Sequence, residues 1–158
     1  MKNNIKEIPV ELFFQLVNDS LKENKNAIFT VTGNSMWPFI GHGRDQVEVV
    51  PIKLSELKKG DIVLFKTPGG AYILHRIMKL TKEGIITSGD GNTYIDGEFS
   101  RSSVLARVSK IIRKGKTLRC ESLSWRIIFT LWRVSFPIRP FLLKTILVFC
   151  RIRKKIKD

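Results

Sequence analysis

Three residue types that could cooperate in nucleophilic catalysis occur in order along this 158-residue chain. Ser35 follows the apparent strand AIFTVT after a short turn, and His75 lies inside the predicted strand AYILHRIMKL. Asp90 and Asp96 lie in the polar, glycine-containing loop SGDGNTYIDGE. A serine nucleophile needs a base that removes its hydroxyl proton and a third group that holds the base in its tautomer. The sequence supplies one candidate for each of the first two roles and two candidates for the third.

Taken one at a time, these residues have ordinary structural explanations. A lone strand histidine is usually a satisfied core or surface residue, and loop aspartates mostly make local turn hydrogen bonds. Alternation along the strand places His75 on the same face as Ile73 and Ile77, with Arg76 on the other face. The second histidine, His42, lies between two glycines in GHGRD, where we expect a solvated loop residue. A catalytic function therefore depends on whether serine, histidine and aspartate meet in space.

The elements that must position these residues are mostly strands. Residues 9–24 carry apolar residues at helical spacing and predict one amphipathic helix. From Ala27 onward, short β-like runs alternate with glycine-rich turns, which predicts six or seven strands in a compact, mostly antiparallel β domain. The runs are AIFTVT, QVEVVPI, DIVLFK, AYILHRIMKL, GIITSG and VLARVSKII. We expect a mainly β fold with a leading helix.

The C-terminal extension (residues 119–158) differs in composition from the β domain (residues 1–118). It holds ten Lys or Arg residues against two acids, more than half of the chain's net charge of +14. Pro137 and Pro140 should break it into two helical pieces, both amphipathic and basic. An apolar stripe recurs at spacings of three and four residues: Trp125, Ile128, Phe129 and Trp132. We predict two short helices appended to the β domain.

The charge of +14 points to nucleic acid, an anionic membrane surface or an acidic partner. The C-terminal extension could lie on an anionic membrane, with Trp125 and Trp132 at headgroup level, or cap the β domain and hold a partner. Both interpretations stay open. The N-terminus has no sustained apolar core of the kind a signal peptide needs, and no apolar run is long enough for a transmembrane helix. We therefore expect a cytoplasmic protein, with any membrane contact peripheral.

Cysteine usage indicates neither a disulfide framework nor a metal site. Cys120 and Cys150 belong to no CxxC pair, and we expect two free, buried or partly buried thiols. No cofactor and no metal is predicted. The sequence does not indicate an oligomeric state.

Four motifs in order, GNSMWP, KKGDIVLFK, YILHRIMKL and ITSGDGNTYID, resemble those of the type I signal peptidase family. The likeness is closer to the endoplasmic-reticulum type, which also occurs in archaea and some Gram-positive bacteria. The serine box reads Ser35-Met36-Trp37-Pro38, and the Gly-Asp-(Ile/Val)-Val box reads Gly60-Asp61-Ile62-Val63. The bacterial type uses a lysine base, whereas the endoplasmic-reticulum type uses the histidine of a His-Arg pair. The resemblance therefore implies that the base is His75 of His75-Arg76, not Lys79.

The resemblance also implies the remaining roles. It covers about residues 25–115, without the family's usual N-terminal membrane anchor. Ser35 would be the nucleophile, Asp96 would orient the histidine, and Asp90 is the supporting or alternative choice. The last box, Gly-Asp-Asn-Asn in the family, departs here at Gly91. The implied activity is a serine endopeptidase that cleaves a peptide or protein precursor after small residues.

Substrate contacts are predicted for the residues beside the nucleophile. Met36, Trp37 and Phe39 would form an apolar lip that docks an extended peptide by strand addition, although Met36 could equally pack in the core. Asn34 could offer its side-chain amide. Two other functions remain: a non-catalytic peptide-binding module of the same fold, and a nucleic-acid-binding β domain. The second lacks interleaved aromatic and basic residues on the strands, since the charge lies mainly in an apolar extension.

Overall fold

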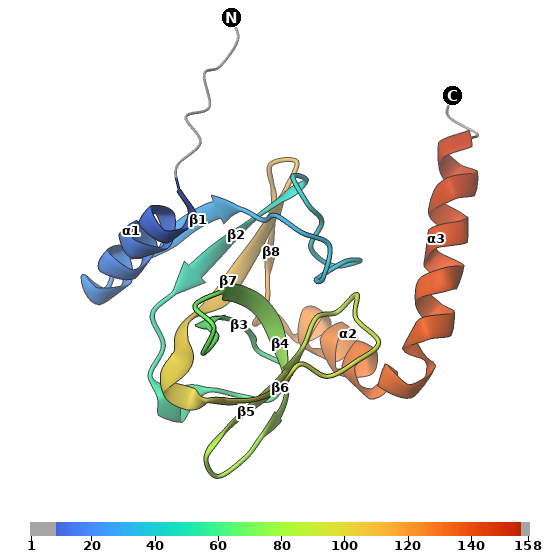
Figure 1. Cartoon of the computed structure of the whole chain (residues 1–158). Helices are drawn as coiled ribbons and strands as arrows, with labels where there is room; N and C mark the ends of the chain where they lie inside the picture. Colours follow the sequence, from blue (N-terminus) through green and yellow to red (C-terminus); the bar gives the residue numbers. More distant parts are fainter. Residues whose placement is uncertain (1–8, 156–158) are drawn as a thin grey trace, which may run out of the picture.

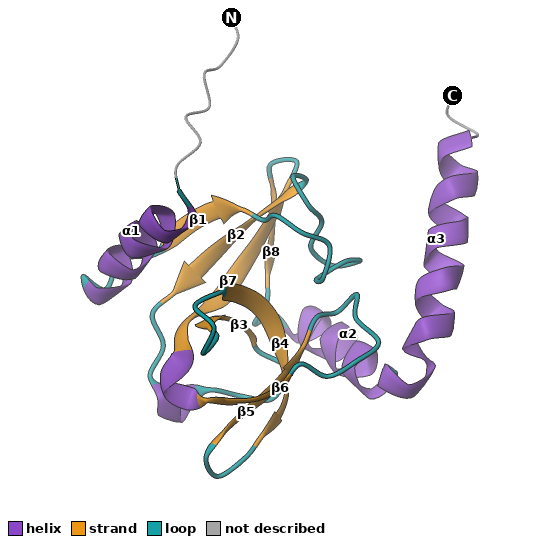
Figure 2. Cartoon of the chain, viewed as in Figure 1, coloured by secondary structure: helices purple, strands orange, loops and turns teal. Residues whose placement is uncertain are grey.

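An antiparallel β-sheet of eight strands forms the body of the protein (Figures 1 and 2). The structure is a computed structural model that describes residues 9–155. The strand order is β1-β2-β7-β3-β4-β5-β6, with β8 paired to β7, and β1 and β6 end the path without pairing to each other. The strands are β1 (Ala27–Thr30), β2 (Asp45–Val50), β3 (Ile62–Lys66), β4 (Tyr72–Leu80), β5 (Gly84–Ser88), β6 (Gly97–Ser100), β7 (Val104–Arg113) and β8 (Lys116–Arg119). The mainly β, antiparallel fold predicted from the sequence is confirmed.

Two of these strands fall outside the predicted runs. β6 begins directly after Asp96, in a segment expected to be a turn, and β8 follows the last predicted strand. Three of the four side chains in each are exposed, so neither shows the apolar alternation that predicts a strand. Both pair with a longer neighbour, β5 and β7 respectively, which supplies the hydrogen-bonding partner. Residue 118, the predicted end of the β domain, lies within β8.

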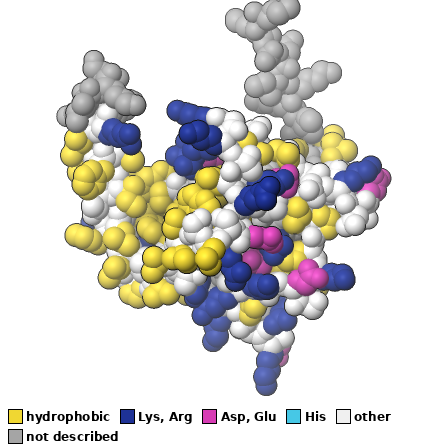
Figure 3. Space-filling view, turned by 180° about the vertical axis from the view of Figure 1, so that it is seen from behind, with side chains coloured by type: hydrophobic (Ala, Val, Ile, Leu, Met, Phe, Trp, Pro, Cys, Tyr) yellow, Lys and Arg dark blue, Asp and Glu magenta, His cyan; other side chains and the backbone are white. Residues whose placement is uncertain are grey.

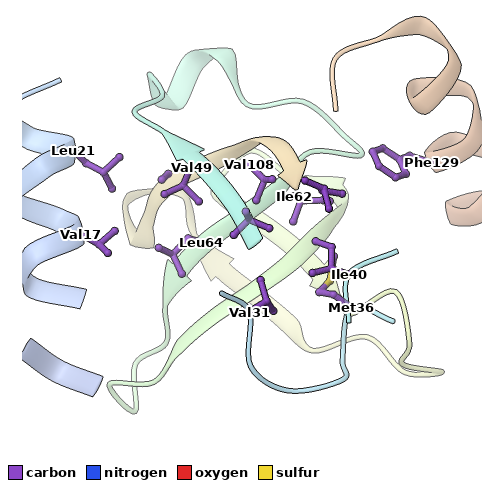
Figure 4. Close-up of a cluster of buried hydrophobic side chains, with 13 residues drawn as sticks. Val17, Leu21, Val31, Met36, Ile40, Val49, Ile62, Leu64, Val108 and Phe129 are labelled. Carbon is purple, nitrogen blue, oxygen red and sulfur yellow. The ribbon is translucent and has the colours of Figure 1, made fainter. Parts of the chain in front are cut away.

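The leading helix α1 (Val10–Lys22) covers one face of the sheet, within the range that the spacing predicted. Val17 and Leu21 point from α1 toward the sheet and are 6% and 7% exposed (Figure 4). Phe14 stacks on the ring of Tyr72 in β4, with centroids 4.2 Å apart. The helix therefore fixes the start of β4 as well as closing the core.

Alternation along the strands divides the core into two clusters. On one face Leu64 of β3 packs with α1 and the Ser35 loop, and on the other Val63 packs with Ile77 and Ile85. Ile73 and Ile77 belong to the second cluster. Arg76 faces the first, where its guanidinium carbon lies 4.1 Å from the ring centroid of Phe129. The predicted placement of these β4 residues is confirmed.

Two helices follow the sheet, and they separate near Pro137 as predicted. They are α2 (Leu123–Val134) and α3 (Arg139–Lys155), joined by the 3₁₀ turn η3 (Phe136–Ile138). Phe129 points from α2 into the core at 5% exposure, so α2 is part of the folded body (Figure 4). Beyond its first turn, α3 projects away from the sheet (Figure 1). Two further 3₁₀ turns lie in connections, η1 (Leu54–Glu56) and η2 (Arg101–Ser103).

None of the helices in the described part of the chain combines the length and apolar character that crossing a bilayer requires.

Candidate active site

The loop between β1 and β2 presents Ser35. Its ends are joined where the Val31 N–H donates to the Asp45 carbonyl at 3.0 Å and the Gly43 N–H donates to Val31 at 2.9 Å. Ser35 and Met36 occupy the centre of a turn closed by the Trp37 N–H on the Asn34 carbonyl at 3.0 Å. The side chain of Met36 is 2% exposed and belongs to the core. The serine is therefore carried on a turn anchored by its buried neighbour.

A buried carboxylate fixes the base of this loop. Asp45 is fully buried and accepts hydrogen bonds from the Gly41 N–H at 2.8 Å, from Arg44 and from Arg113. Arg113 also donates to the Phe39 carbonyl at 2.6 Å. Burial alone would raise the pKa of Asp45, but the hydrogen bonds from Arg113, Arg44 and Gly41 outweigh it and lower the pKa to about 2.

His42 has a structural partner that the sequence did not indicate. It is exposed, as predicted, but its Nδ1 accepts a hydrogen bond from the Gly33 N–H at 3.0 Å. Gly33 has φ +84°, in the left-handed region that favours glycine. His42 thus holds the turn that leads into Ser35.

His75 is held by Asp96, the first choice of the sequence analysis. His75 Nδ1 lies 2.5 Å from Asp96 Oδ2, and the two side chains are 8% and 11% exposed. The hydroxyl of Thr87 donates to the same carboxylate oxygen at 2.9 Å. Because an ionised carboxylate can only accept, the proton of a neutral His75 lies on Nδ1 and its Nε2 carries the free lone pair. Thr87 gave no signal in the sequence beyond its place in a strand.

Gly89 lies where His75 and the loop that carries Ser35 meet. A Cβ placed on Gly89 would lie 2.4 Å from the Ser35 carbonyl oxygen and 3.0 Å from His75 Nε2. The two atoms are therefore at most about 5.4 Å apart, the sum of those distances. The Ser35 carbonyl also accepts a hydrogen bond from the Gly91 N–H at 2.7 Å. The structure thus brings Ser35, His75 and Asp96 into one region, with Nε2 on the side of the serine loop.

Close approach also accounts for glycine at position 91, where the signal peptidase motif that the sequence resembles has asparagine. A Cβ there would lie 2.9 Å from the carbonyl oxygens of both Asn34 and Trp37. Such a contact is too short for a side chain unless the serine loop moves. The departure from the motif is consistent with a serine loop packed directly on the 89–92 backbone.

Asp90 is paired with Arg76, not with His75 as the alternative prediction had it. Its two carboxylate oxygens accept from Arg76 Nε at 2.7 Å and Nη2 at 2.6 Å. Both residues are fully buried, and Arg76 Nη1 donates to the Gly60 carbonyl at 2.8 Å. The alternative in which Asp90 orients His75 is therefore wrong, because both oxygens of its carboxylate are bound to Arg76. Asp90 and Arg76 form a buried pair that ties the 89–92 loop to β4.

Two residues of the C-terminal extension, neither of them predicted from the sequence, also hold the 89–92 loop. Trp132 of α2 donates its indole N–H to the Asp90 carbonyl at 3.1 Å. Arg139, at the start of α3 and fully buried, donates from Nη1 to the carbonyls of Gly89 and Asn92, each at 3.1 Å. Burial lowers the pKa of the Arg139 guanidinium. The extension is therefore connected to the site through backbone hydrogen bonds.

A cavity of about 270 Å³ lies beside Ser35 and His75. It is bounded by residues 31–33 after β1 and by residues 72–75 at the start of β4. Among the described residues, the 72–75 segment pairs only with β3, so the other edge of β4 is open there, and β1, which precedes residues 31–33, pairs only with β2. Ile77 directs its N–H and carbonyl toward β3, so alternation turns those of Tyr72 and Leu74 toward the cavity.

The predicted substrate contacts beside the serine are only partly placed at this cavity. Met36 lines it, although its side chain is mostly in the core. Trp37 does not line it, and Asn34 is exposed. The ring of Phe39 packs edge-on against Phe129 of α2, with centroids 5.3 Å apart, and also against the ring of Trp132. The expected apolar lip is therefore wrong for Phe39, which instead docks α2.

A larger cavity of about 350 Å³ lies between β3, β7 and α2 and contains neither Ser35 nor His75. Asp61 lines it, and burial raises the pKa of that carboxyl group. Cys120 also lines it, and burial raises the pKa of this thiol to about 11. Cys120 is half-buried and Cys150 is exposed, and both are free. Within residues 9–155, no three His, Cys, Asp or Glu side chains are grouped so that they could hold a metal ion.

This chain matches no model of a known protein family, no curated protein and no solved structure. The likeness to signal peptidases thus consists of the four motifs alone. The chemistry of the site follows from the placement of its side chains.

Proposed function

We propose that the protein is a serine endopeptidase of the signal-peptidase-like type that cleaves a peptide or protein precursor. Ser35 is the nucleophile, His75 the general base and Asp96 the residue that orients the base. The observation that carries this proposal is the contact of 2.5 Å between His75 Nδ1 and Asp96 Oδ2, with Nε2 on the side of the Ser35 loop. Nucleophile, base and orienting group in this order are the minimum set for acyl transfer by serine.

The first step forms a bond between Ser35 Oγ and the scissile carbonyl carbon, while His75 Nε2 takes the hydroxyl proton. As the C–N bond breaks, the same nitrogen gives this proton to the leaving amine. Water then attacks the resulting ester, again with His75 as base, and regenerates the serine. Asp96 stabilises the imidazolium that forms in each half-reaction and keeps the Nδ1 tautomer, and the Thr87 hydroxyl fixes the position of its carboxylate.

Backbone N–H groups are available for the oxyanion. Among the described residues, the N–H groups of Ser35 and Met36 have no hydrogen-bond acceptor. The N–H of Gly33 is already bonded to His42, and Gly33 has no side chain that could donate to the oxyanion. We infer that the oxyanion is bound by N–H groups of the Ser35 turn, whose position is fixed before the substrate arrives.

The open strand edges supply a binding mode for the substrate. An extended peptide that enters the cavity can accept from and donate to the free backbone groups of Tyr72 and Leu74, as an added strand does. The cavity has a volume of about 270 Å³ and must hold the backbone of the substrate as well as its side chains, so it leaves room for small side chains only. This agrees with the small residues that the family resemblance implies on the acyl side of the scissile bond.

The structure favours histidine over lysine as the base. Lys79 lies four residues further along β4, is exposed, and pairs across to Ile86 of β5. It does not line the cavity that contains Ser35. His75, by contrast, lines this cavity together with Ser35.

Cleavage of candidate precursors, with new termini identified by mass spectrometry, tests the proposal. We expect the wild-type protein to generate new termini after small residues, and Ser35→Ala to generate none while it folds normally. Ser102→Ala, at an exposed serine in η2, is the matched control and should cleave as the wild type does. Peptides that bind to the wild type but stay intact would indicate the non-catalytic module instead. Equal cleavage by Ser35→Ala would exclude the assignment.

A further inference from the structure

Helix α2 carries apolar side chains on two opposite faces. Phe129 and Trp132 face the core, as expected for a surface helix. The face turned away from the core should be polar, yet Leu123, Ile127 and Leu131 on it are 76%, 51% and 66% exposed. Their spacing of four residues forms a continuous stripe along the helix.

Exposed apolar side chains also follow this stripe along η3 and α3, and we call the whole set the outer apolar surface. It comprises Leu123, Ile127, Leu131, Val134, Ile138, Phe141, Val148, Phe149 and Ile152, each at least half exposed. Figure 3, seen from behind, shows hydrophobic side chains gathered over the side of the molecule that carries α3. An apolar area of this kind on a folded protein marks a contact with a partner or a membrane.

The charge around this surface identifies the partner. From Ser122 to Lys155 the sequence contains eight Lys or Arg residues and no Asp or Glu. One of the eight, Arg139, is buried in the site. Two copies joined through this surface would place cations against cations, which opposes self-association. An anionic bilayer complements both features, since acyl chains receive the apolar side chains and headgroups receive the cations.

We propose that the outer apolar surface binds an anionic lipid bilayer, with α2 and α3 lying in its interface. Leu131 and Phe141 enter the boundary between headgroups and acyl chains. The tryptophans predicted to lie at headgroup level do not, because Trp132 is buried and Trp125 packs against the core. This binding does not depend on the proposed peptidase activity. Membrane binding would hold the site at the bilayer surface, because Arg139 at the start of α3 is hydrogen-bonded to the 89–92 loop beside His75.

Vesicle co-sedimentation of the full chain tests the apolar half of the proposal. The vesicles contain phosphatidylcholine alone or phosphatidylcholine with phosphatidylglycerol. We expect the wild type to bind the anionic vesicles. The double variant Ile127→Ser, Leu131→Ser should bind them at least about tenfold more weakly. The matched control is Leu12→Ser with Leu16→Ser, at exposed apolar positions of α1, which should bind as the wild type does.

Charge substitutions test the other half. Lys144→Gln with Arg151→Gln should weaken binding to anionic vesicles about tenfold, and raised salt should weaken the wild type likewise. Lys82→Gln with Lys116→Gln removes the same charge from exposed positions on the β domain and should have a smaller effect. Circular dichroism confirms that every variant is folded.

Three results would overturn the proposal. The first is no binding to anionic vesicles at low salt, and the second is unchanged binding by the folded Ile127→Ser, Leu131→Ser variant. The third is a dimer in sedimentation velocity that dissociates in this variant while vesicles bind neither protein. That last result would assign the outer apolar surface to a second copy of the chain.

Discussion

Asp90 and Asp96 are six residues apart, and the structure gives them different partners, Arg76 and His75, so that substitution can separate their effects. Asp90→Asn removes the charge that neutralises Arg76, whereas Asp96→Asn removes the charge that faces His75. The first variant should lose stability, and the second should lose activity. Asparagine is nearly the same size as aspartate, so packing changes little in either case.

The stability cost at Asp90 follows from burial. Arg76 is fully buried and donates to both carboxylate oxygens of Asp90, at 2.7 and 2.6 Å, so water cannot replace the lost carboxylate. Removing one partner of a buried pair costs about 3–5 kcal/mol, because an uncompensated charge remains. For a domain of this size, that loss lowers the melting temperature by on the order of 10 °C. Trp132 bonds only the Asp90 backbone carbonyl, and this bond persists.

The cost at Asp96 is mainly catalytic. The ionised carboxylate of Asp96 holds His75 in the tautomer that carries its proton on Nδ1. The amide of Asp96→Asn can instead donate its N–H to Nδ1 and hold the opposite tautomer, with the proton on Nε2. We expect kcat/KM to fall about 10²–10⁴-fold for Asp96→Asn. Asp96 lies near the surface, with 11% of its side chain exposed, so the stability loss should be about 1 kcal/mol.

Urea unfolding gives the free energy for both variants, and peptide cleavage gives kcat/KM at a temperature where both are folded. We expect a larger stability loss in Asp90→Asn and a larger activity loss in Asp96→Asn. Equal losses of stability would contradict the buried pair. A folded Asp90→Asn that is inactive, beside a fully active Asp96→Asn, would reverse the two roles.

Three other predictions concern different parts of the molecule. Gly89→Ala should lower cleavage about 100-fold, because the added Cβ would lie 2.4 Å from the backbone carbonyl oxygen of Ser35 and displace the Ser35 loop. Gly69→Ala, in an open turn, should cleave normally. Asp45 has a pKa of about 2, below its usual 3.8, so its contribution is present above pH 4 and lost as the pH falls toward 2. Asp45→Asn should therefore cost about 2 kcal/mol at pH 7 and flatten acid unfolding curves between pH 4 and 2. At pH 7, mass spectrometry should find iodoacetamide on exposed Cys150 and little on Cys120, whose thiol has a pKa of about 11. Unchanged cleavage by Gly89→Ala would contradict the close contact with Ser35, and an unchanged acid unfolding curve for Asp45→Asn would contradict the lowered pKa of Asp45. Full labelling of Cys120 would contradict the raised pKa of its thiol.

The sequence predicted the elements that carry strong periodicity. The helix at residues 9–24 and the strand around His75 were readable because burial imposes a spacing on their apolar residues. β6 and β8 were missed because an exposed strand paired on one side imposes no such spacing. Phe39 was placed at the substrate for a related reason, since periodicity does not reveal which apolar residues a later helix will cover.

The candidate site divides in the same way. Residue types and order predicted Ser35, His75 and one of two aspartates, and the structure brings Ser35, His75 and Asp96 into one region. They did not separate Asp96 from Asp90, because the partner of each is set by strand pairing across β4 and β5. Arg139 was missed since nothing in a basic segment distinguishes one buried arginine from its solvated neighbours.

The most direct test of the central claim is to detect the acyl-enzyme itself. The protein is mixed with a pool of peptides that carry small residues, quenched in acid within its turnover time, and analysed by intact and tryptic mass spectrometry. In the wild type, we predict an acyl adduct on the tryptic peptide that contains Ser35. Any condition that slows deacylation should increase the fraction of protein that carries this adduct. Ser35→Ala should carry none. Peptide cleavage that proceeds at an equal rate in Ser35→Ala, with no adduct in either protein, would contradict the account.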